Sequence, residues 1–269
     1  MSLLTDNLKG AVPFLLFFAL AHMFKAARFY LVLLERDIPL RRYLFLYART
    51  TLVNLAIPFK LGELYRFAAV HHVTSKSEKS PHAATSFLSV CVDRYFDTVA
   101  LLVIIIPFGL MYNGRIDFVP LLLFLALLVL ALVYFSIPQS YRYLNEYIIM
   151  YRRTKRSVNM LGFLEVIKEW HDFTGGLIKG RAPLMLIASF LGWAAEFMAL
   201  RGFYEMAGSS FAMEDFGRYI NSLLAGSSDS MAIRYNATGI AIFAAVTVVF
   251  CIMWVFKAGE RNAANPDRV

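Results

Sequence analysis

The chain alternates long apolar runs with short polar connections, a pattern typical of a membrane protein. Runs of about 20 residues are long enough for a helix to cross roughly 30 Å of hydrocarbon. We predict five full transmembrane helices, at about 11–34, 83–111, 118–138, 183–207 and 237–257. The pattern thus predicts an all-α, polytopic protein with one helical transmembrane domain over 1–257 and a polar tail at 258–269.

Two further stretches are interrupted and do not read as simple spans. Segment 43–70 is either one broken span or a re-entrant hairpin that enters and leaves by the same face. Basic residues flank it on both sides, in 35–49 and 71–82, which favours the re-entrant form because basic loops tend to face the cytoplasm. Segment 216–235 is too short and polar to span and is a candidate for a second re-entrant element. Two interrupted segments in opposed halves are typical of inverted-repeat transporters, although these two share no visible similarity.

Segment 139–182 contains eight Lys or Arg against four acidic residues. Phe163, Val166, Ile167 and Trp170 follow the spacing of one helix face, which predicts an amphipathic helix on the cytoplasmic face. With this segment inside and the nearly neutral loop at 112–117 outside, the N-terminus is expected outside and the C-terminus in the cytoplasm. We therefore expect a multi-pass protein of the inner or plasma membrane of the cell.

Composition supports this class and excludes others. The apolar fraction is 59% and the charged fraction 17%, whereas soluble domains carry about 45–50% and about 25%. The net charge of +8 reflects loops beside spans, so we expect membrane lipids as partners and no nucleic acid. Neither the histidines at 71, 72 and 82 nor the two cysteines have partners at metal-ligand spacing, so no metal, cofactor or catalytic site is expected.

A backbone break is predicted in the middle of segment 43–70. Pro58 removes a helical hydrogen bond, and Gly62 allows another backbone to approach closely. Asn54 lies just before this break. Broken-helix termini of this kind form binding sites for anionic groups.

Three charged residues follow the break at three-residue spacing and share a face if this part is helical: Lys60, Glu63 and Arg66. Glu63 pairs with one cation and leaves a positive charge to spare, which suits a phosphate or another anionic headgroup. The alternative is an interfacial elbow whose charges extend into water.

A second charged group lies inside the apolar run at 83–111. Asp93 and Asp97 are four residues apart and face the same way, and Arg94 reaches Asp97 at three-residue spacing. The surplus negative charge could meet Arg66 or Lys60. The alternative is an ion-pair network that only fixes helix packing. Glu196, inside the fourth run, is a further candidate for proton coupling or pairing.

These residues resemble a known family. Asn54, Pro58, Gly62-Glu63 and Arg66, followed by Asp93-Arg94-Tyr95-Phe96-Asp97, resemble the flippase-like integral membrane family named for the transmembrane region of lysylphosphatidylglycerol synthetase. The resemblance is specific over about 50–100. It implies a polytopic protein that handles lipids, often near glycolipid or polysaccharide assembly, here without the soluble synthetase domain. Relatives carry a Pro- and Gly-rich stretch ending in an acid in the second half, where this chain has Gly226 and Asp229 but no proline.

Three functions are open at this point. The favoured one is a translocase of an anionic phospholipid or a polyprenyl-phosphate-linked glycan lipid, with the headgroup held in a polar intramembrane cavity. Lys60, Arg66, Asn54 and Glu63 would bind the headgroup, while Asp93, Arg94, Asp97 and Glu196 would form a charge or coupling network. The second is a non-transporting accessory subunit of a glycan or glycolipid biosynthesis complex, with a glycosyltransferase or another membrane-associated enzyme as partner. The third is a membrane-embedded transferase acting on a lipid-linked substrate.

Overall fold

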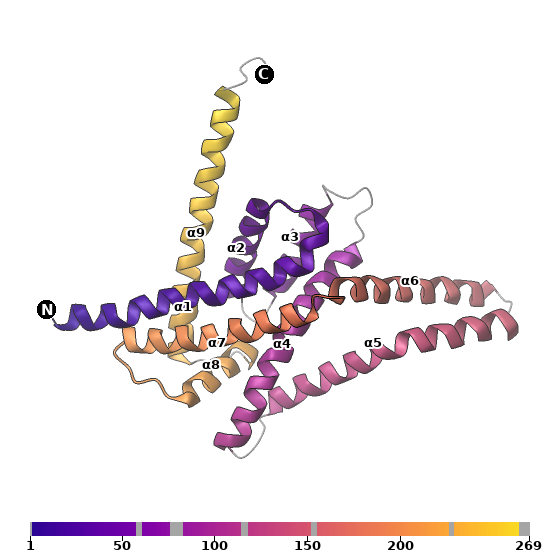
Figure 1. Cartoon of the computed structure of the whole chain (residues 1–269), viewed down its shortest axis with the longest axis horizontal. Helices are drawn as coiled ribbons and strands as arrows, with labels where there is room; N and C mark the ends of the chain where they lie inside the picture. The colour runs from indigo at the N-terminus through magenta and orange to yellow at the C-terminus, as the bar shows by residue number, and fades with distance from the viewer. Residues whose placement is uncertain are drawn as a thin grey trace. The chain divides into compact units, whose positions relative to one another are not determined.

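A computed structural model describes residues 2–57, 61–75, 83–113, 118–151, 155–225 and 229–263, and all its regular elements are helical. The expected all-α class is therefore confirmed for this part of the chain (Figure 1). The helices are α1 (Ser2–Leu33), α2 (Leu40–Ala56), α3 (Gly62–Thr74), α4 (Ala83–Asn113), α5 (Phe118–Tyr151), α6 (Lys155–Ile178), α7 (Ala182–Met206), α8 (Met213–Ala225) and α9 (Ser230–Ala263), with a 3-10 turn at Leu34–Arg36.

Among the described residues, four helices are long and apolar enough to cross a membrane: Gly10–Arg36, Phe118–Met150, Ala182–Met206 and Ser230–Met253. They correspond to four of the five predicted spans. The fifth predicted span, 83–111, is helical as α4 but carries three charged residues in its first half and is not among these four. Its passage across the bilayer stays a prediction.

The predicted end of the third span at residue 138 is wrong. Helix α5 continues through Pro138 to Tyr151, so the first part of the expected polar segment 139–182 belongs to this helix. Proline removes one backbone hydrogen bond, but the less exposed face formed by Tyr141, Leu144 and Ile148 continues past it. Packing of that face decides the helix length. Further along this segment, Lys155–Ile178 forms α6.

The start of the last span is also earlier than the predicted residue 237. Asp229 is the reason, because its side chain accepts a hydrogen bond from the backbone N–H of Met231 at 3.3 Å. This is the geometry of an N-cap, which satisfies an otherwise unpaired donor at the helix start. Helix α9 therefore begins at Ser230.

Both predicted interruptions lie where one described helix ends and the next begins. Segment 43–70 consists of α2 and α3, which pack against each other and are separated by residues 57–61. Segment 216–235 contains the end of α8 and the start of α9. Their re-entrant topology stays a prediction. Pro58 and Lys60, like Gly226, lie outside the described residues.

The chain divides into two compact units. The first comprises Met1–Phe14, Asp37–Ser77 and Leu200–Val269. Here α2 runs antiparallel to α9: Arg41 donates to the carbonyl of Met253 at 3.2 Å, and the rings of Phe45 and Phe250 lie 6.3 Å apart. Further along, the rings of Tyr47 and Phe243 are 6.4 Å apart. Helix α2 therefore lies along a membrane-spanning candidate.

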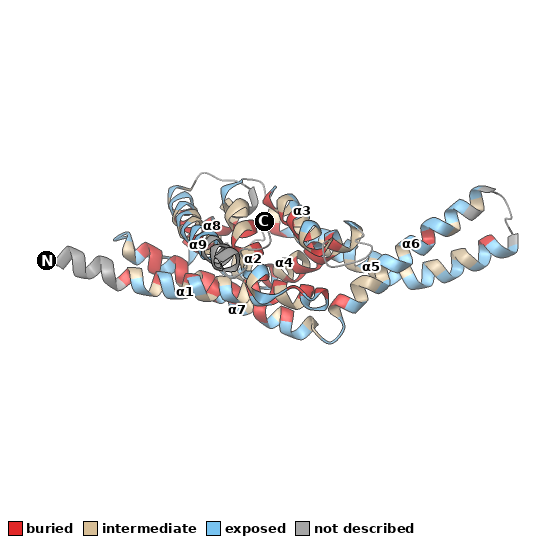
Figure 2. Cartoon of the chain, turned by 90° about the horizontal axis from the view of Figure 1, so that it is seen from above, coloured by how far each residue is buried: buried red, intermediate tan, exposed pale blue. Residues whose placement is uncertain are grey.

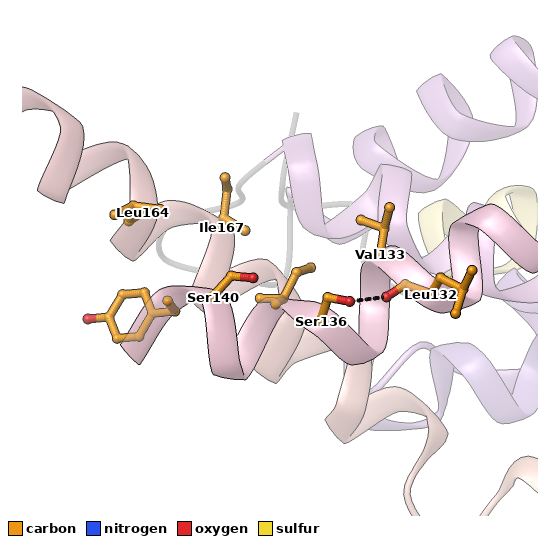
Figure 3. Close-up of a pocket in the computed structure, with 8 residues that line it drawn as sticks. Leu132, Val133, Ser136, Ser140, Leu164 and Ile167 are labelled. Atoms are coloured by element: carbon orange, nitrogen blue, oxygen red, sulfur yellow. Dashed lines mark hydrogen bonds between the residues drawn. The ribbon is translucent and has the colours of Figure 1, made fainter. Parts of the chain in front are cut away.

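The second unit comprises Leu15–Arg36 and Glu78–Ala199. Helices α4, α5 and α6 pack against one another, and α5 and α6 lie side by side as a long hairpin (Figure 1). Much of this hairpin is exposed or half-buried (Figure 2). Between its helices lies a groove of about 340 Å³ lined by apolar side chains such as Val133, Leu164 and Ile167 (Figure 3). In that groove Ser136 donates to the carbonyl of Leu132 in its own helix at 2.6 Å.

Candidate functional site

Arg28 is the centre of a buried ionic cluster in the second unit. Its Nε donates to Asp93 Oδ1 at 2.8 Å, and its Nη1 donates to Asp97 Oδ1 at 2.5 Å. Nη1 also donates to the hydroxyl of Ser189 at 3.0 Å. The side chain of Arg28 is 1% exposed and that of Asp93 0%. One guanidinium thus joins α1, α4 and α7.

The same two carboxylates hold a second arginine on their own helix. Arg94 Nη2 donates to Asp93 Oδ2 at 2.7 Å, and its Nη1 donates to Asp97 Oδ2 at 3.3 Å. The predicted reach of Arg94 to Asp97 is therefore confirmed. The two oxygens of each carboxylate are divided between Arg28 and Arg94.

Lys25 and Glu196 form a neighbouring ion pair, with Lys25 Nζ 2.6 Å from Glu196 Oε2. The ammonium group also lies 5.2 Å from the centre of the Trp193 ring, a cation–π geometry. Trp193 in turn donates to the backbone carbonyl of Asp97 at 3.3 Å. These contacts connect Glu196 to the acidic pair on α4.

Helical spacing explains why these side chains meet. Lys25 and Arg28 are three residues apart on α1, and Asp93 and Asp97 are four apart on α4, so each pair shares a helix face. Three cations and three carboxylates result, so the group is electrically balanced. We call it the α1–α4–α7 cluster; it contains Lys25, Arg28, Asp93, Arg94, Asp97, Ser189, Trp193 and Glu196.

The two cations that α1 contributes to this cluster were not predicted from the sequence. Asp93, Arg94, Asp97 and Glu196 were singled out, but their α1 partners, Lys25 and Arg28, were not. The signal was present, because two cations at three-residue spacing inside a spanning run need nearby acids. The surplus acidic charge on α4, which we expected to meet Arg66 or Lys60, is matched here by Arg28.

The first unit holds a smaller polar group at the junction of α2 and α3. Asn54 Nδ2 donates to Glu63 Oε1 at 2.9 Å, and the other Glu63 oxygen lies 3.4 Å from Arg66 Nη1. Arg66 is buried, with a side chain 3% exposed, and Glu63 is half-buried. Glu63 also lies in the first turn of α3, where the helix dipole favours a carboxylate. We call Asn54, Gly62, Glu63 and Arg66 the α2–α3 cluster.

Gly62 has the close approach that the sequence predicted. A Cβ atom at this position would lie 2.8 Å from Asn54 Oδ1 and 2.9 Å from the Asn54 backbone nitrogen. Real Cβ atoms essentially never approach backbone so closely. The absence of a side chain at Gly62 therefore lets the start of α3 pack directly on α2 and places Glu63 beside Asn54.

A charge exchange tests the Lys25–Glu196 pair. We expect Lys25→Glu and Glu196→Lys each to destabilise the protein, approaching the roughly 3–5 kcal/mol that follows loss of one partner of a buried pair. The double variant restores an opposite-charge pair and should recover much of this loss. The apparent melting temperature in detergent, followed by size-exclusion chromatography after heating, measures the effect. Additive losses in the double variant would contradict a direct interaction.

Comparison with known proteins shows which family the chain belongs to. The family model described as lysylphosphatidylglycerol synthase TM region matches residues 1–214. No curated protein and no solved structure matches the chain. The matched residues include every member of both clusters and extend well beyond the 50–100 region in which the resemblance was most specific. The chain therefore belongs to the lysylphosphatidylglycerol synthase TM region family, as a membrane protein with several candidate spans.

Proposed function

We propose that the protein binds the anionic headgroup of a membrane lipid at the α2–α3 cluster and moves that lipid between leaflets. The observation that carries the proposal is the buried Arg66, which lies beside Glu63 on the helix that follows the predicted break. A buried cation in a membrane protein is evidence for a binding role. Placing a charged group at membrane depth costs free energy, so such groups persist where they pair with an opposite charge or bind a ligand.

The family supports a lipid as the ligand. Its name refers to the membrane region of a synthase of a lysyl-modified phosphatidylglycerol. The substrate class we propose is an anionic phospholipid or a polyprenyl-phosphate-linked glycan lipid, since both present phosphate oxygens to Arg or Lys.

In this mechanism Arg66 and Lys60 hold the phosphate. Asn54 and Glu63 orient Arg66, because Glu63 shares its two oxygens between the Asn54 amide and the Arg66 guanidinium. Pro58 and Gly62 provide the backbone break and the close helix contact. The α1–α4–α7 cluster, with Asp93, Arg94, Asp97 and Glu196, provides the charge network, and its carboxylates are the candidates for binding a coupling proton.

A liposome assay tests transport. Purified protein is reconstituted with fluorescent phosphatidylglycerol, and a membrane-impermeant reductant reports the fraction of label that reaches the outer leaflet. We expect Arg66→Gln to slow this movement at least about tenfold, because a hydrogen bond to a charged group contributes roughly 1.5–3 kcal/mol.

Arg201→Gln is the matched control. Arg201 also pairs with a glutamate on its own helix, Glu205 at 3.0 Å, but both side chains are about half exposed. This variant should transport as the wild type does. Equal rates for Arg66→Gln and wild type, with both proteins folded, would contradict the mechanism. Wild-type protein that moves no lipid but co-purifies with a glycosyltransferase would favour the accessory role instead, and a product formed from a lipid donor would favour the transferase.

A further inference from the structure

Arg49 on α2 is surrounded by aromatic rings, whereas Arg28 and Arg66 pair with carboxylates. Its guanidinium carbon lies 5.7 Å from the centre of the Phe45 ring and 5.6 Å from that of Tyr65. Phe45 precedes it by one turn of α2, and Tyr65 comes from α3. The guanidinium therefore lies over two aromatic rings that come from two helices, a cation–π arrangement that arginine favours.

Arg49 has no carboxylate partner among the described residues. Its Nε is buried and makes no hydrogen bond to any of them, while the residue as a whole is half-buried. Nε is the only Arg49 nitrogen that is enclosed in this way, so the two Nη groups remain accessible. By contrast, Arg66 has Glu63, and Arg28 is bonded to both carboxylates on α4.

Arg49 lies alongside a candidate membrane span, where a charged group without a carboxylate partner costs free energy. Helix α2 descends along the candidate span Ser230–Met253 of α9, with Phe45 beside Phe250 and Tyr47 beside Phe243. Arg49 is two residues beyond Tyr47, so it lies alongside the middle of that span. A guanidinium stays protonated and cannot escape the cost of this position by losing its charge. An anion supplied from outside the described chain would compensate it.

We propose that Arg49 binds the phosphate of a lipid headgroup through its accessible Nη groups, with Phe45 and Tyr65 holding the guanidinium plane in position. The proposal rests on the proposed function and adds a binding residue to it. A planar guanidinium presents two parallel N–H donors to two phosphate oxygens, which an ammonium group does not. The chemical class of ligand is a phosphate ester with net negative charge.

Native mass spectrometry of the full-length protein in detergent tests this binding. The protein is titrated separately with phosphatidylglycerol, phosphatidylcholine and inorganic phosphate. We expect phosphatidylglycerol to bind most tightly, and Arg49→Gln to weaken its binding at least about tenfold, as expected for loss of hydrogen bonds from a charged donor. Arg42→Gln, an exposed arginine on the same helix, should bind as the wild type does.

Several results would overturn the proposal. The first is equal affinity of wild type and Arg49→Gln for phosphatidylglycerol. The second is a loss of affinity in Arg42→Gln as large as that in Arg49→Gln. The third is inorganic phosphate binding as tightly as the lipid, which would indicate a site for a free anion. If Arg49→Gln does not remain monodisperse, Arg49→Lys decides. A loss of several-fold with charge retained supports bidentate binding, and unchanged affinity overturns it.

The liposome assay separates this inference from transport. If wild type binds phosphatidylglycerol through Arg49 but moves no lipid, the binding site stands and the translocase function fails. If wild type moves lipid and Arg49→Gln moves it equally fast, translocation stands and the role of Arg49 fails.

Discussion

Arg28→Ala should be among the most destabilising single substitutions in the chain. It removes the one side chain that is bonded to Asp93, Asp97 and Ser189 at once, and leaves a fully buried carboxylate with Arg94 as its remaining described cation. Loss of one partner from a buried ion pair costs about 3–5 kcal/mol. For a domain of this size that corresponds to a fall of roughly 6–20 °C in melting temperature.

The apparent melting temperature in detergent measures this effect, with Arg201→Ala as the control. Arg201 also loses an ion pair, but an exposed one, which contributes less than about 1 kcal/mol. Arg28→Lys should be intermediate, because an ammonium group keeps the charge but lacks the planar fork that reaches both carboxylates. If Arg28→Ala melts at the same temperature as Arg201→Ala, the α1–α4–α7 cluster does not hold the helices together.

The pattern of apolar and polar residues predicted the helices well where local signals are strong. Long apolar runs correctly predicted α1, α7 and most of α5, because the length and hydropathy of a segment determine whether it can cross the bilayer as a helix. The interruption before Gly62 was likewise visible, since proline and glycine act through the backbone. A close backbone approach at Gly62 followed from the same reasoning, whereas its partner, Asn54, was not predicted.

The errors arose where distant parts of the chain decide the outcome. Helix α5 continues past Pro138 because its less exposed face stays packed against other helices. The residues around Pro138 do not by themselves predict this continuation. The charge of Arg28 within an apolar run was visible, but its pairing with Asp93 was not, because the two residues are 65 positions apart along the chain. Arg49 was read only as part of a basic flank, whereas its rings come from α2 and α3 together.

The two clusters differ in charge balance, and this suggests a division of roles. In the α1–α4–α7 cluster the cations and carboxylates are equal in number, so no net charge is left for a ligand. In the first unit the described ion pair of Arg66 is with Glu63, whereas Arg49 lies over two aromatic rings and has no carboxylate partner among the described residues. An anionic headgroup is therefore expected at α2 and α3, while the balanced cluster suits helix packing.

Gly62→Ala should separate the start of α3 from α2. The added Cβ would lie within 3 Å of both the backbone nitrogen and the side-chain oxygen of Asn54, and backbone atoms cannot move aside as a flexible side chain would. Overpacking of this kind costs typically 1–3 kcal/mol, and it would also displace Glu63 from Asn54. We therefore expect lower stability and a larger loss of lipid movement than stability alone explains.

Gly162→Ala on α6 is the matched control, because its added Cβ would meet no atom within 4 Å other than those of the adjacent backbone of its own helix. There the same substitution should stabilise the helix by up to about 1 kcal/mol, since alanine is the better helix former. The melting temperature and the rate of liposome transport are measured for both variants. The difference between the variants separates the effect of steric contact from that of helix propensity. Opposite signs for the two glycines would support direct backbone contact between α2 and α3, and a stabilised, fully active Gly62→Ala would contradict it.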